Sequence, residues 1–281
     1  MKKWLTGALA ATSIFALAAC GADDSTGDNE GTEEGGQVEL IVGASNVPHA
    51  KILEEAQPLL KEQGVDLVIE TYQDYILPNQ DLEAGEIDAN YFQSLPYFEQ
   101  QIAELGYDFV NAGGIHVEPI AVYSQKYDSL DELPDGAEII MSNSVTDHPR
   151  ILSLLEEEGL ITLDPEVDKM VAEVGDIQDN PKNLDFSFDV EASLLVQFYE
   201  NDEGDAILIN SNYAIDAGLN PLEDSIAIEG SESPYVNIIA VNSGDEDNEA
   251  VQKLVEVLMS EEIQDYILEE WNGNVIPGDA E

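Results

Sequence analysis

The sequence VELIVGASNVPHAKILEEAQPLLKEQGVDLVIE, residues 38–70, contains the pattern that decides the fold. Apolar residues dominate 38–44 and again 65–70, and each run has the length and composition of a buried strand. The segment between them, 48–63, repeats apolar side chains at the spacing of an amphipathic helix: Ile52, Leu53, Ala56, Leu59 and Leu60. A strand, a helix and a second strand in this order predict a mostly parallel sheet that is covered by helices.

The same alternation continues along the chain and predicts an α/β protein. Further strands are expected at 107–110, 119–123, 138–141, 206–209, 225–228 and 236–241. A helix is expected over 149–158, because Pro149 suits a first helical turn and Gly159 suits a stop. The final helix is predicted from Val251 to Ile263, following the acidic residues 245–247.

The N-terminus has the layout of an export signal. Lys2 and Lys3 precede an apolar run over 5–19 that is too short to span a bilayer comfortably. The run ends Leu-Ala-Ala-Cys at Cys20 and resembles a bacterial lipobox, so we expect a lipoprotein signal peptide over 1–19. Cleavage before Cys20 would leave a cysteine that takes a diacylglycerol, and the polar residues after it would form a disordered tether over 20–37. An ordinary signal peptide is the alternative.

The charge of the chain narrows its partners and its surroundings. Sixty acidic residues against nine basic ones give a net charge of -51, which disfavours nucleic acid and other anionic partners. Such a chain repels itself in dilute buffer, whereas molar salt screens the repulsion. A salt-rich exterior, as for a halophile, is therefore one interpretation, and an alkaline exterior is the other; composition does not separate them.

Motifs of catalysis and of metal binding give little support to an enzyme. With so many carboxylates, acid pairs occur by chance, and no nucleophile elbow, Walker loop or dinucleotide fingerprint is present. His49, His116 and His148 lie far apart in the sequence without the spacing of a metal motif. A metal site that gathers the three across a cleft stays open as an alternative.

Arg150 is the only arginine in the chain, and it opens the predicted helix directly after the polar run 142–148. One interpretation is a surface ion pair. The sharper one is a clamp for a small carboxylate, because a guanidinium presents paired donors that match that group. The adjacent helix N-terminus would add to the positive potential.

Aromatic residues concentrate between Tyr72 and Phe98. The six are Tyr72, Tyr75, Tyr91, Phe92, Tyr97 and Phe98. Core packing explains some of them. Their density on the predicted loops 74–79 and 88–96 also suits a cleft that holds an apolar side chain and a few hydrogen bonds.

Ordered sequence blocks run through the whole chain from Val38 onward. In the first half they are Val42-Gly43-Ala44 with Pro48-His49-Ala50, the run 74–79, the run 88–93 with Pro96-Tyr97, and His116-Val117-Glu118-Pro119. In the second half they are the runs 179–182, 209–214, 217–221 and 233–237. With these blocks the chain resembles the methionine-binding lipoproteins of ABC importers, which are NlpA-type substrate-binding proteins.

The resemblance implies a bilobal, periplasmic-binding-protein-like fold of two α/β lobes joined by two crossovers. Lobe 1 would comprise 38–120 plus 236–281, and lobe 2 would comprise 121–235. By the same resemblance, an arginine matching Arg150 binds the ligand carboxylate, and asparagines matching Asn212 and Asn237 hold its backbone groups. The residues that would enclose its side chain are Tyr75, Phe92 and Tyr97, with Ser94 in the wall where the family usually has histidine.

The function implied is an extracytoplasmic solute-binding protein, lipid-anchored at the cell membrane, that captures an amino acid, in the first place L-methionine. It would deliver this amino acid to an ABC permease and its ATPase as a monomer, without cofactor, metal or covalent chemistry. Three departures from the family pattern, at Ser94, in 143–148 and around 194–197, leave another amino acid or a methionyl peptide as alternatives. A metal-ion carrier and a secreted hydrolase or isomerase on the same scaffold are the remaining ones.

Overall fold

The computed structural model describes residues 37–278. The predicted signal peptide, Cys20 and the tether up to residue 36 lie outside the described residues. Over 37–278, none of the helices combines the length and the apolar character that a membrane span requires.

One mixed sheet of six strands forms the first half of the fold. Its order is β13-β4-β12-β3-β1-β2, and β1 runs parallel to β2 and β3 whereas β12 runs antiparallel to β3 and β4. The strands are β1 Val38–Ser45, β2 Val65–Tyr72, β3 Ala89–Ser94, β4 Phe109–Val117, β12 Val236–Asn242 and β13 Ile276–Pro277.

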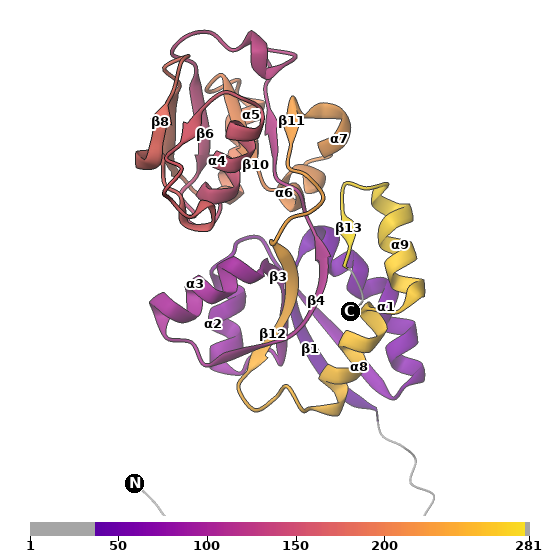
Figure 1. Cartoon of the computed structure of the whole chain (residues 1–281). Helices are drawn as coiled ribbons and strands as arrows, with labels where there is room; N and C mark the ends of the chain where they lie inside the picture. The colour runs from indigo at the N-terminus through magenta and orange to yellow at the C-terminus, as the bar shows by residue number, and fades with distance from the viewer. Residues whose placement is uncertain (1–36, 279–281) are drawn as a thin grey trace, which may run out of the picture. The chain divides into compact units, whose positions relative to one another are not determined.

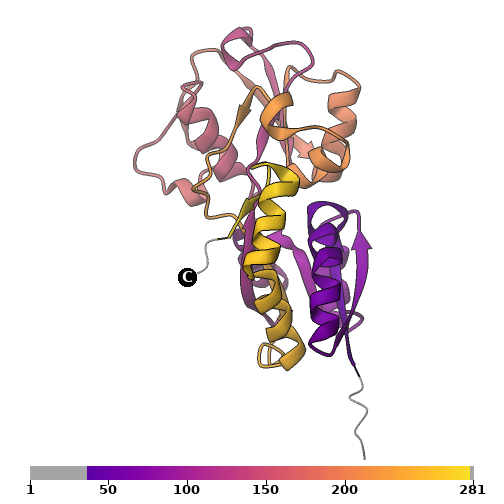
Figure 2. The same cartoon turned by 90° about the vertical axis from the view of Figure 1, so that its right-hand side faces the viewer.

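Helices cover both faces of this sheet. Figure 2 shows α1 (Lys51–Glu62) beside α8 (Glu249–Leu258) and α9 (Glu261–Trp271), and their apolar stripes share one core with β1. A helical turn, Asn46–Ala50, leads into α1. The opposite face packs on α2 (Leu77–Ala84) and α3 (Leu95–Leu105) through a smaller apolar cluster. Burial on both faces explains why β1 is a continuous apolar run in the sequence.

A second mixed sheet of five strands forms the other half. Its order is β11-β5-β10-β6-β9, and β6 runs parallel to β9 and β10 whereas β5 runs antiparallel to β10 and β11. The strands are β5 Ala121–Tyr123, β6 Glu138–Ser142, β9 Asp185–Val190, β10 Ala206–Ile209 and β11 Ala227–Ile228. A separate two-stranded ribbon pairs β7 (Thr162–Leu163) with β8 (Ile177–Asp179).

This second sheet is also covered on both faces. The helix α4 (His148–Glu157) packs on one face, and α5 (Leu195–Glu200) and α6 (Ser211–Asp216) pack on the other. A short helix, α7 (Pro221–Asp224), follows α6. Single helical turns lie at Leu130–Glu132, Lys169–Val171, Val174–Asp176 and Ala192–Leu194.

The chain passes between the two sheets twice, and this gives the bilobal α/β fold that the sequence predicts (Figure 1). It leaves the six-stranded sheet after β4, builds the five-stranded sheet, and returns through residues 229–235 to β12. Because β12 enters from the other lobe, it lies between β4 and β3 with the opposite direction to β3. Most strands of each sheet run in one direction, as predicted, but β12 and β13 in the first sheet and β5 in the second run the opposite way, so both sheets are mixed.

Two predictions from the sequence are corrected. The segment 88–96, predicted as a loop, contains the central strand β3. Its polar residues are not typical of a buried strand, which is why the sequence pattern did not predict it. The predicted single helix from Val251 to Ile263 is two helices, because the backbone at Ser260 is extended, with φ -67° and ψ 152°. The first of them begins after Asn248, whose side chain accepts a hydrogen bond from the backbone N–H of Ala250.

Candidate functional site

A pocket with an empty volume of about 460 Å³ lies between the two sheets, where parallel strands of each end. The helical turn after β1 supplies His49, β3 ends at Ser94, the segment after β6 supplies Arg150, and the segment after β10 supplies Asn212. Ligands of open α/β sheets bind outside the carboxyl ends of the strands, and this pocket occupies that position in both lobes.

All the ligand-binding residues that the sequence singles out line this one pocket. They are Tyr75, Phe92, Ser94, Tyr97, Arg150, Asn212 and Asn237. The two sheets contribute to it jointly, since Ser94 lies on β3 opposite Asn237 on β12, whereas Arg150 and Asn212 belong to helices of the other lobe. The structure thus brings together side chains that are up to 162 residues apart in the chain, from 75 to 237.

Three aromatic rings form one wall of the pocket. The ring centroids of Tyr75, Phe92 and Tyr97 lie 6.0 to 6.2 Å from one another. The Tyr97 hydroxyl donates to the backbone oxygen of Tyr75 at 3.0 Å, and the Tyr75 hydroxyl donates to Asn212 Oδ1 at 2.6 Å. Burial raises the pKa of both phenols, so they stay neutral at physiological pH. The wall is apolar on its faces and carries no charge.

A buried amide network holds this aromatic wall in place. Asn79 Oδ1 accepts hydrogen bonds from Asn90 and from Gln93, both at 2.9 Å, and Asn90 Oδ1 accepts another from Gln93 at 2.9 Å. All three side chains are almost completely buried. Because buried amides without partners are costly, this network fixes α2 against β3 and thereby positions Phe92 and Ser94.

Arg150 lies on the opposite side of the pocket, in the first turn of α4. Its residue is only 8% exposed, which excludes the interpretation as a surface ion pair. Nη2 is 3.2 Å from Asp147 Oδ1, Nη1 is 3.6 Å from Glu229 Oε2, and the guanidinium carbon is 4.8 Å from the ring centroid of Tyr235. Burial acts to lower the pKa of Arg150, but Asp147 and then Glu229 outweigh it and raise the pKa.

Two pocket-lining residues, Arg150 and Asn210, each have a buried polar atom without a hydrogen-bond partner among the described residues. Asp147 Oδ2 accepts from Ser142 Oγ and from Asn210 Nδ2, each at 3.1 Å. Within residues 37–278, Arg150 Nε and Asn210 Oδ1 are buried and have no hydrogen-bond partner in the protein. A ligand with both donors and acceptors would satisfy these atoms, because buried polar groups are stable only when they are paired.

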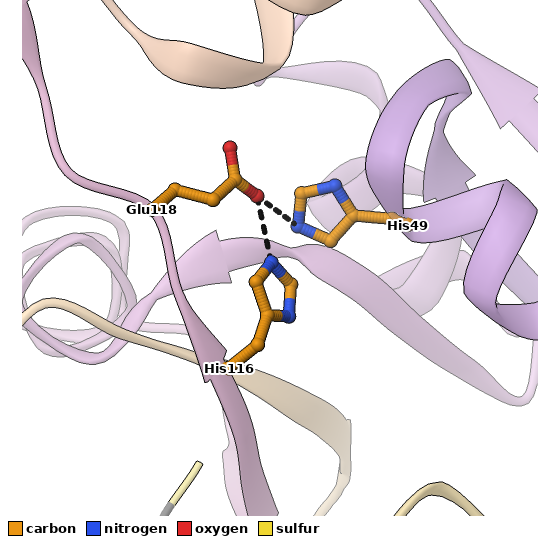
Figure 3. Close-up of side chains that lie close together, drawn as sticks. All are labelled: His49, His116 and Glu118. Atoms are coloured by element: carbon orange, nitrogen blue, oxygen red, sulfur yellow. Dashed lines mark hydrogen bonds and ion pairs between the residues drawn. The ribbon is translucent and has the colours of Figure 1, made fainter. Parts of the chain in front are cut away.

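The floor of the pocket contains a buried cluster of His49, His116 and Glu118 (Figure 3). Glu118 Oε1 lies 2.8 Å from His116 Nε2 and 3.3 Å from His49 Nε2. Burial lowers the pKa of His49 to about 4 and that of His116 to about 3, so both imidazoles are neutral at physiological pH. Burial raises the pKa of Glu118, and His49, Arg150 and the backbone N–H of Asn212 oppose that rise.

The metal site suggested as an alternative by the sequence is formed only in part. His49 and His116 meet at Glu118, and the ligating atoms of these three residues lie within 4.8 Å of one another. His148 does not join them. Its Nε2 bonds the backbone oxygen of Ser142 at 2.9 Å, and its ring packs against Phe188.

The pocket also contains lining residues that the sequence did not single out as site residues, and among them are Glu118, Asp147 and Asn210. The sequence pattern does not distinguish the carboxylates of Glu118 and Asp147 from the others, because the chain has sixty acidic residues. The signal that could have found Asp147 and Asn210 is their position just after the strands β6 and β10. For Glu118 it is the position directly after β4, where the chain leaves the sheet.

The lining of the pocket suits the binding of a small zwitterion. It combines one guanidinium, carboxylates, amides and an aromatic wall, which are the groups that recognise a carboxylate, an ammonium and an apolar side chain. The hydroxyl of Tyr75 donates a hydrogen bond to Asn212 across the cleft, so two of these lining residues already join its two sides.

Comparison with known proteins identifies relatives over the whole described region. The family model of the NlpA lipoprotein matches residues 40–279. The methionine-binding lipoprotein MetQ of Bacillus subtilis is 46% identical over 279 residues, and the alignment covers 99% of both chains.

Solved structures have the same fold. A pheromone cOB1 precursor/lipoprotein of the YaeC family from Enterococcus faecalis is 54% identical with a TM-score of 0.84, covering 85% of this chain and 100% of that one. A nutrient-binding protein from Burkholderia cenocepacia, bound to methionine, is 36% identical with a TM-score of 0.80 over 85% of this chain and 100% of its own. At these identities the likeness extends beyond topology to the family.

Proposed function

The chain belongs to the NlpA lipoprotein family, and from this membership we propose that it captures L-methionine outside the cytoplasmic membrane for an ABC importer. The observation that carries the proposal is the single pocket that sets the buried guanidinium of Arg150 against the aromatic wall of Tyr75, Phe92 and Tyr97. Relatives named for methionine binding, and one solved with methionine bound, support the same ligand.

Each group of methionine has a partner of suitable chemistry in this pocket. The α-carboxylate is bound by Arg150, whose Nε has no partner among residues 37–278 and whose planar fork suits two parallel hydrogen bonds. Asn212 and Asn237 supply amides for the backbone groups. The thioether enters the aromatic wall, where a polarizable sulfur contacts ring edges favourably. With Ser94 in place of a histidine, this wall contains no imidazole.

Binding is coupled to closure of the two lobes, which we place at 38–120 plus 236–281 and at 121–235. Two hydrogen bonds already join the lobes beside the pocket, from Tyr75 to Asn212 at 2.6 Å and from Asn46 to Asp216 at 2.6 Å. A ligand that contacts both walls stabilises the closed arrangement over the open one. The importer would recognise this closed form, which distinguishes loaded protein from empty protein.

The remaining parts of the proposal concern location and partners. Lipid attached to Cys20 would hold the monomer at the outer face of the cell membrane, close to the permease and its ATPase. The protein then performs no covalent chemistry, and its cycle consists of capture, closure and delivery.

A thermal-shift screen of the full-length lipoprotein in detergent and high salt tests the ligand. The ligands are the twenty L-amino acids, D-methionine and a set of methionyl dipeptides. A ligand at a hundred times its Kd stabilises the folded state by about 2.7 kcal/mol, which is readily measured. We expect L-methionine to give the largest shift among the amino acids. A shift with another amino acid alone, or with a dipeptide alone, would contradict the methionine assignment.

A further inference from the structure

Glu118 is a buried carboxylate at the centre of the site, and its residue is only 6% exposed. It lies on the segment between β4 and β5, where the chain crosses from one lobe to the other, and it lines the pocket. Among the described residues the ion-pair partners of its carboxylate are two imidazoles; Arg150 Nη1 donates only to its backbone oxygen, at 3.5 Å, and no lysine pairs with it. A buried carboxylate in this position requires a positive partner.

The hydrogen bonds around Glu118 assign a proton to each imidazole. The carboxylate of Glu118 accepts hydrogen bonds only, so His116 Nε2 carries the imidazole hydrogen, and His116 Nδ1 is left to accept the hydroxyl hydrogen of Tyr91. His49 Nε2 faces two acceptors, Asn237 Oδ1 at 3.0 Å and Glu118 Oε1 at 3.3 Å, so it also carries hydrogen. Two neutral donors therefore converge on one oxygen. Figure 3 shows the other oxygen pointing away from both rings.

The charges of the pocket do not balance without a ligand that carries a cation. Its lining has the carboxylates of Glu118 and Asp147 against the one guanidinium of Arg150, and Arg150 also pairs with Glu229. A ligand that brought only a carboxylate would add negative charge to this buried set. A ligand with an ammonium as well adds no net charge, and it supplies the cation that Glu118 lacks.

We propose that Glu118 is the counter-ion of the ligand's α-ammonium group, with His49 and His116 as the residues that position its carboxylate. This inference rests on the proposed function and deepens it, because it makes a free amino group a condition for binding. N-acylated amino acids and carboxylic acids without the amino group are then excluded from the pocket. The hydroxyl of Tyr91 influences Glu118 only indirectly, because it is hydrogen-bonded to the ring of His116.

The geometry favours an ammonium over a metal ion at this cluster. A metal bound by His49 Nε2 would displace the hydrogen to Nδ1, and Nδ1 is buried without a partner in the described part of the chain. Metal-bound imidazoles usually donate that second N–H to a carboxylate, a carbonyl or water. The contact between His49 and Asn237 would also be lost. An ammonium leaves both existing hydrogen bonds unchanged.

Isothermal titration of the full-length lipoprotein in detergent tests the inference with two matched ligands. They are L-methionine and 4-(methylthio)butanoic acid, which differs from methionine by the amino group alone. We expect the wild type to prefer methionine by at least about 100-fold, as for a buried charge pair. In Glu118→Gln, which keeps the side-chain volume, methionine affinity falls at least about 30-fold, and the preference for methionine largely disappears.

The preference is a ratio measured on one protein sample, so a change in folded fraction alone does not alter it. Glu229→Gln is the matched control, since it removes a carboxylate next to Arg150 that does not line the pocket. It should leave the ratio unchanged. Glu118→Asp is a second variant in case the glutamine variant does not fold, and it should reduce the ratio by shortening the carboxylate's reach.

Three outcomes would overturn the inference. One is a preserved preference in Glu118→Gln or in Glu118→Asp. Another is metal bound to the purified wild type together with a loss of methionine affinity on addition of a chelator. The third is wild-type binding of both ligands with equal affinity. If the wild type binds a different amino acid, the methionine assignment fails by itself, and the same ratio is measured with that amino acid and its des-amino counterpart.

Discussion

The two walls of the cleft differ in the chemistry of their side chains. One wall is aromatic and uncharged, and it consists of Tyr75, Phe92 and Tyr97 of the six-stranded lobe. The wall of the five-stranded lobe is charged and amide-rich, and its key residues are Arg150 and Asn212. We infer from this difference that recognition has two tasks: the aromatic wall would contact the side chain of the ligand, and the charged wall, together with Asn237 and Glu118, would contact its backbone groups. A ligand must satisfy both, which is why it favours closure.

The local structure of each wall matches its task. Phe92 and Ser94 belong to a strand that is hydrogen-bonded on both sides, which gives the aromatic wall a fixed register. Arg150 and Asn212 lie in first turns of helices directly after strands, where polar side chains and unpaired backbone groups concentrate. Glu118 lies between the two walls, at one of the crossovers.

The largest effect is expected from the charged wall, on replacing Arg150 by alanine. Methionine affinity should fall at least about 100-fold, because the ligand carboxylate loses its buried partner. Titration calorimetry measures the loss, and the melting temperature without ligand reports the fold. Lys169→Ala is the control, since this half-exposed cation pairs with Glu156 outside the pocket and should not change the affinity. Unchanged affinity in Arg150→Ala would refute the carboxylate clamp.

A second test uses pH to probe the buried neutral imidazole of His116. The pKa of His116 is lowered from 6.5 to about 3 in the folded state, so between these values only the unfolded chain takes up the proton. Stability contributed by this group is therefore present above pH 6.5 and is lost as the pH falls. Relative to His116→Gln, the unfolding free energy of the wild type should fall by about 1.4 kcal/mol per pH unit below pH 6.5.

Urea unfolding in high salt at a series of pH values measures this difference. The comparison between the two proteins removes the general effect of titrating the many carboxylates, which both share. Equal pH profiles for wild type and variant would show that His116 carries a proton in the folded protein as readily as in the unfolded one.

These walls also show which part of the site could be predicted from the sequence. Arg150 was recognisable as the only arginine, and the aromatic residues were recognisable by their density. Their assembly into one pocket follows from their positions near strand ends, and the ordered blocks shared with a known family supplied Asn212 and Asn237. The amphipathic helix α1 and the strands around it were equally clear, because their apolar periodicity is local.

Other features depend on contacts that periodicity does not encode. The strand β3 reads as a loop because Asn90 and Gln93 are polar, and only their bonds to Asn79 make them suitable for burial. The antiparallel β12 depends on the return of the chain from the second lobe. Glu118 was unremarkable among sixty acidic residues until its burial and its histidine neighbours distinguished it.

A smaller effect is expected from the aromatic wall. Phe92→Leu keeps an apolar surface but removes the ring, so methionine affinity should fall by about 3- to 10-fold, in line with the strength of sulfur–aromatic contacts. Phe109→Leu is the matched control, since this ring stacks on Tyr107 away from the pocket. It should lower the melting temperature without lowering the affinity. A loss in Phe92→Leu as large as in Arg150→Ala would contradict the division of tasks between the walls.

The smallest effect is expected at the end of β3, in the aromatic wall, on replacing Ser94 by histidine. Ser94 precedes α3, but its hydroxyl makes no capping hydrogen bond there, so its loss should not destabilise the helix. The new imidazole would lie near the ligand's side chain and not near Arg150. Methionine affinity should therefore change less than about 5-fold, while the preference for methionine over norleucine changes by a similar factor, both measured by titration calorimetry. Affinity that falls about 100-fold would instead mean that Ser94 lies against the ligand's backbone groups, and that the aromatic wall takes part in both tasks.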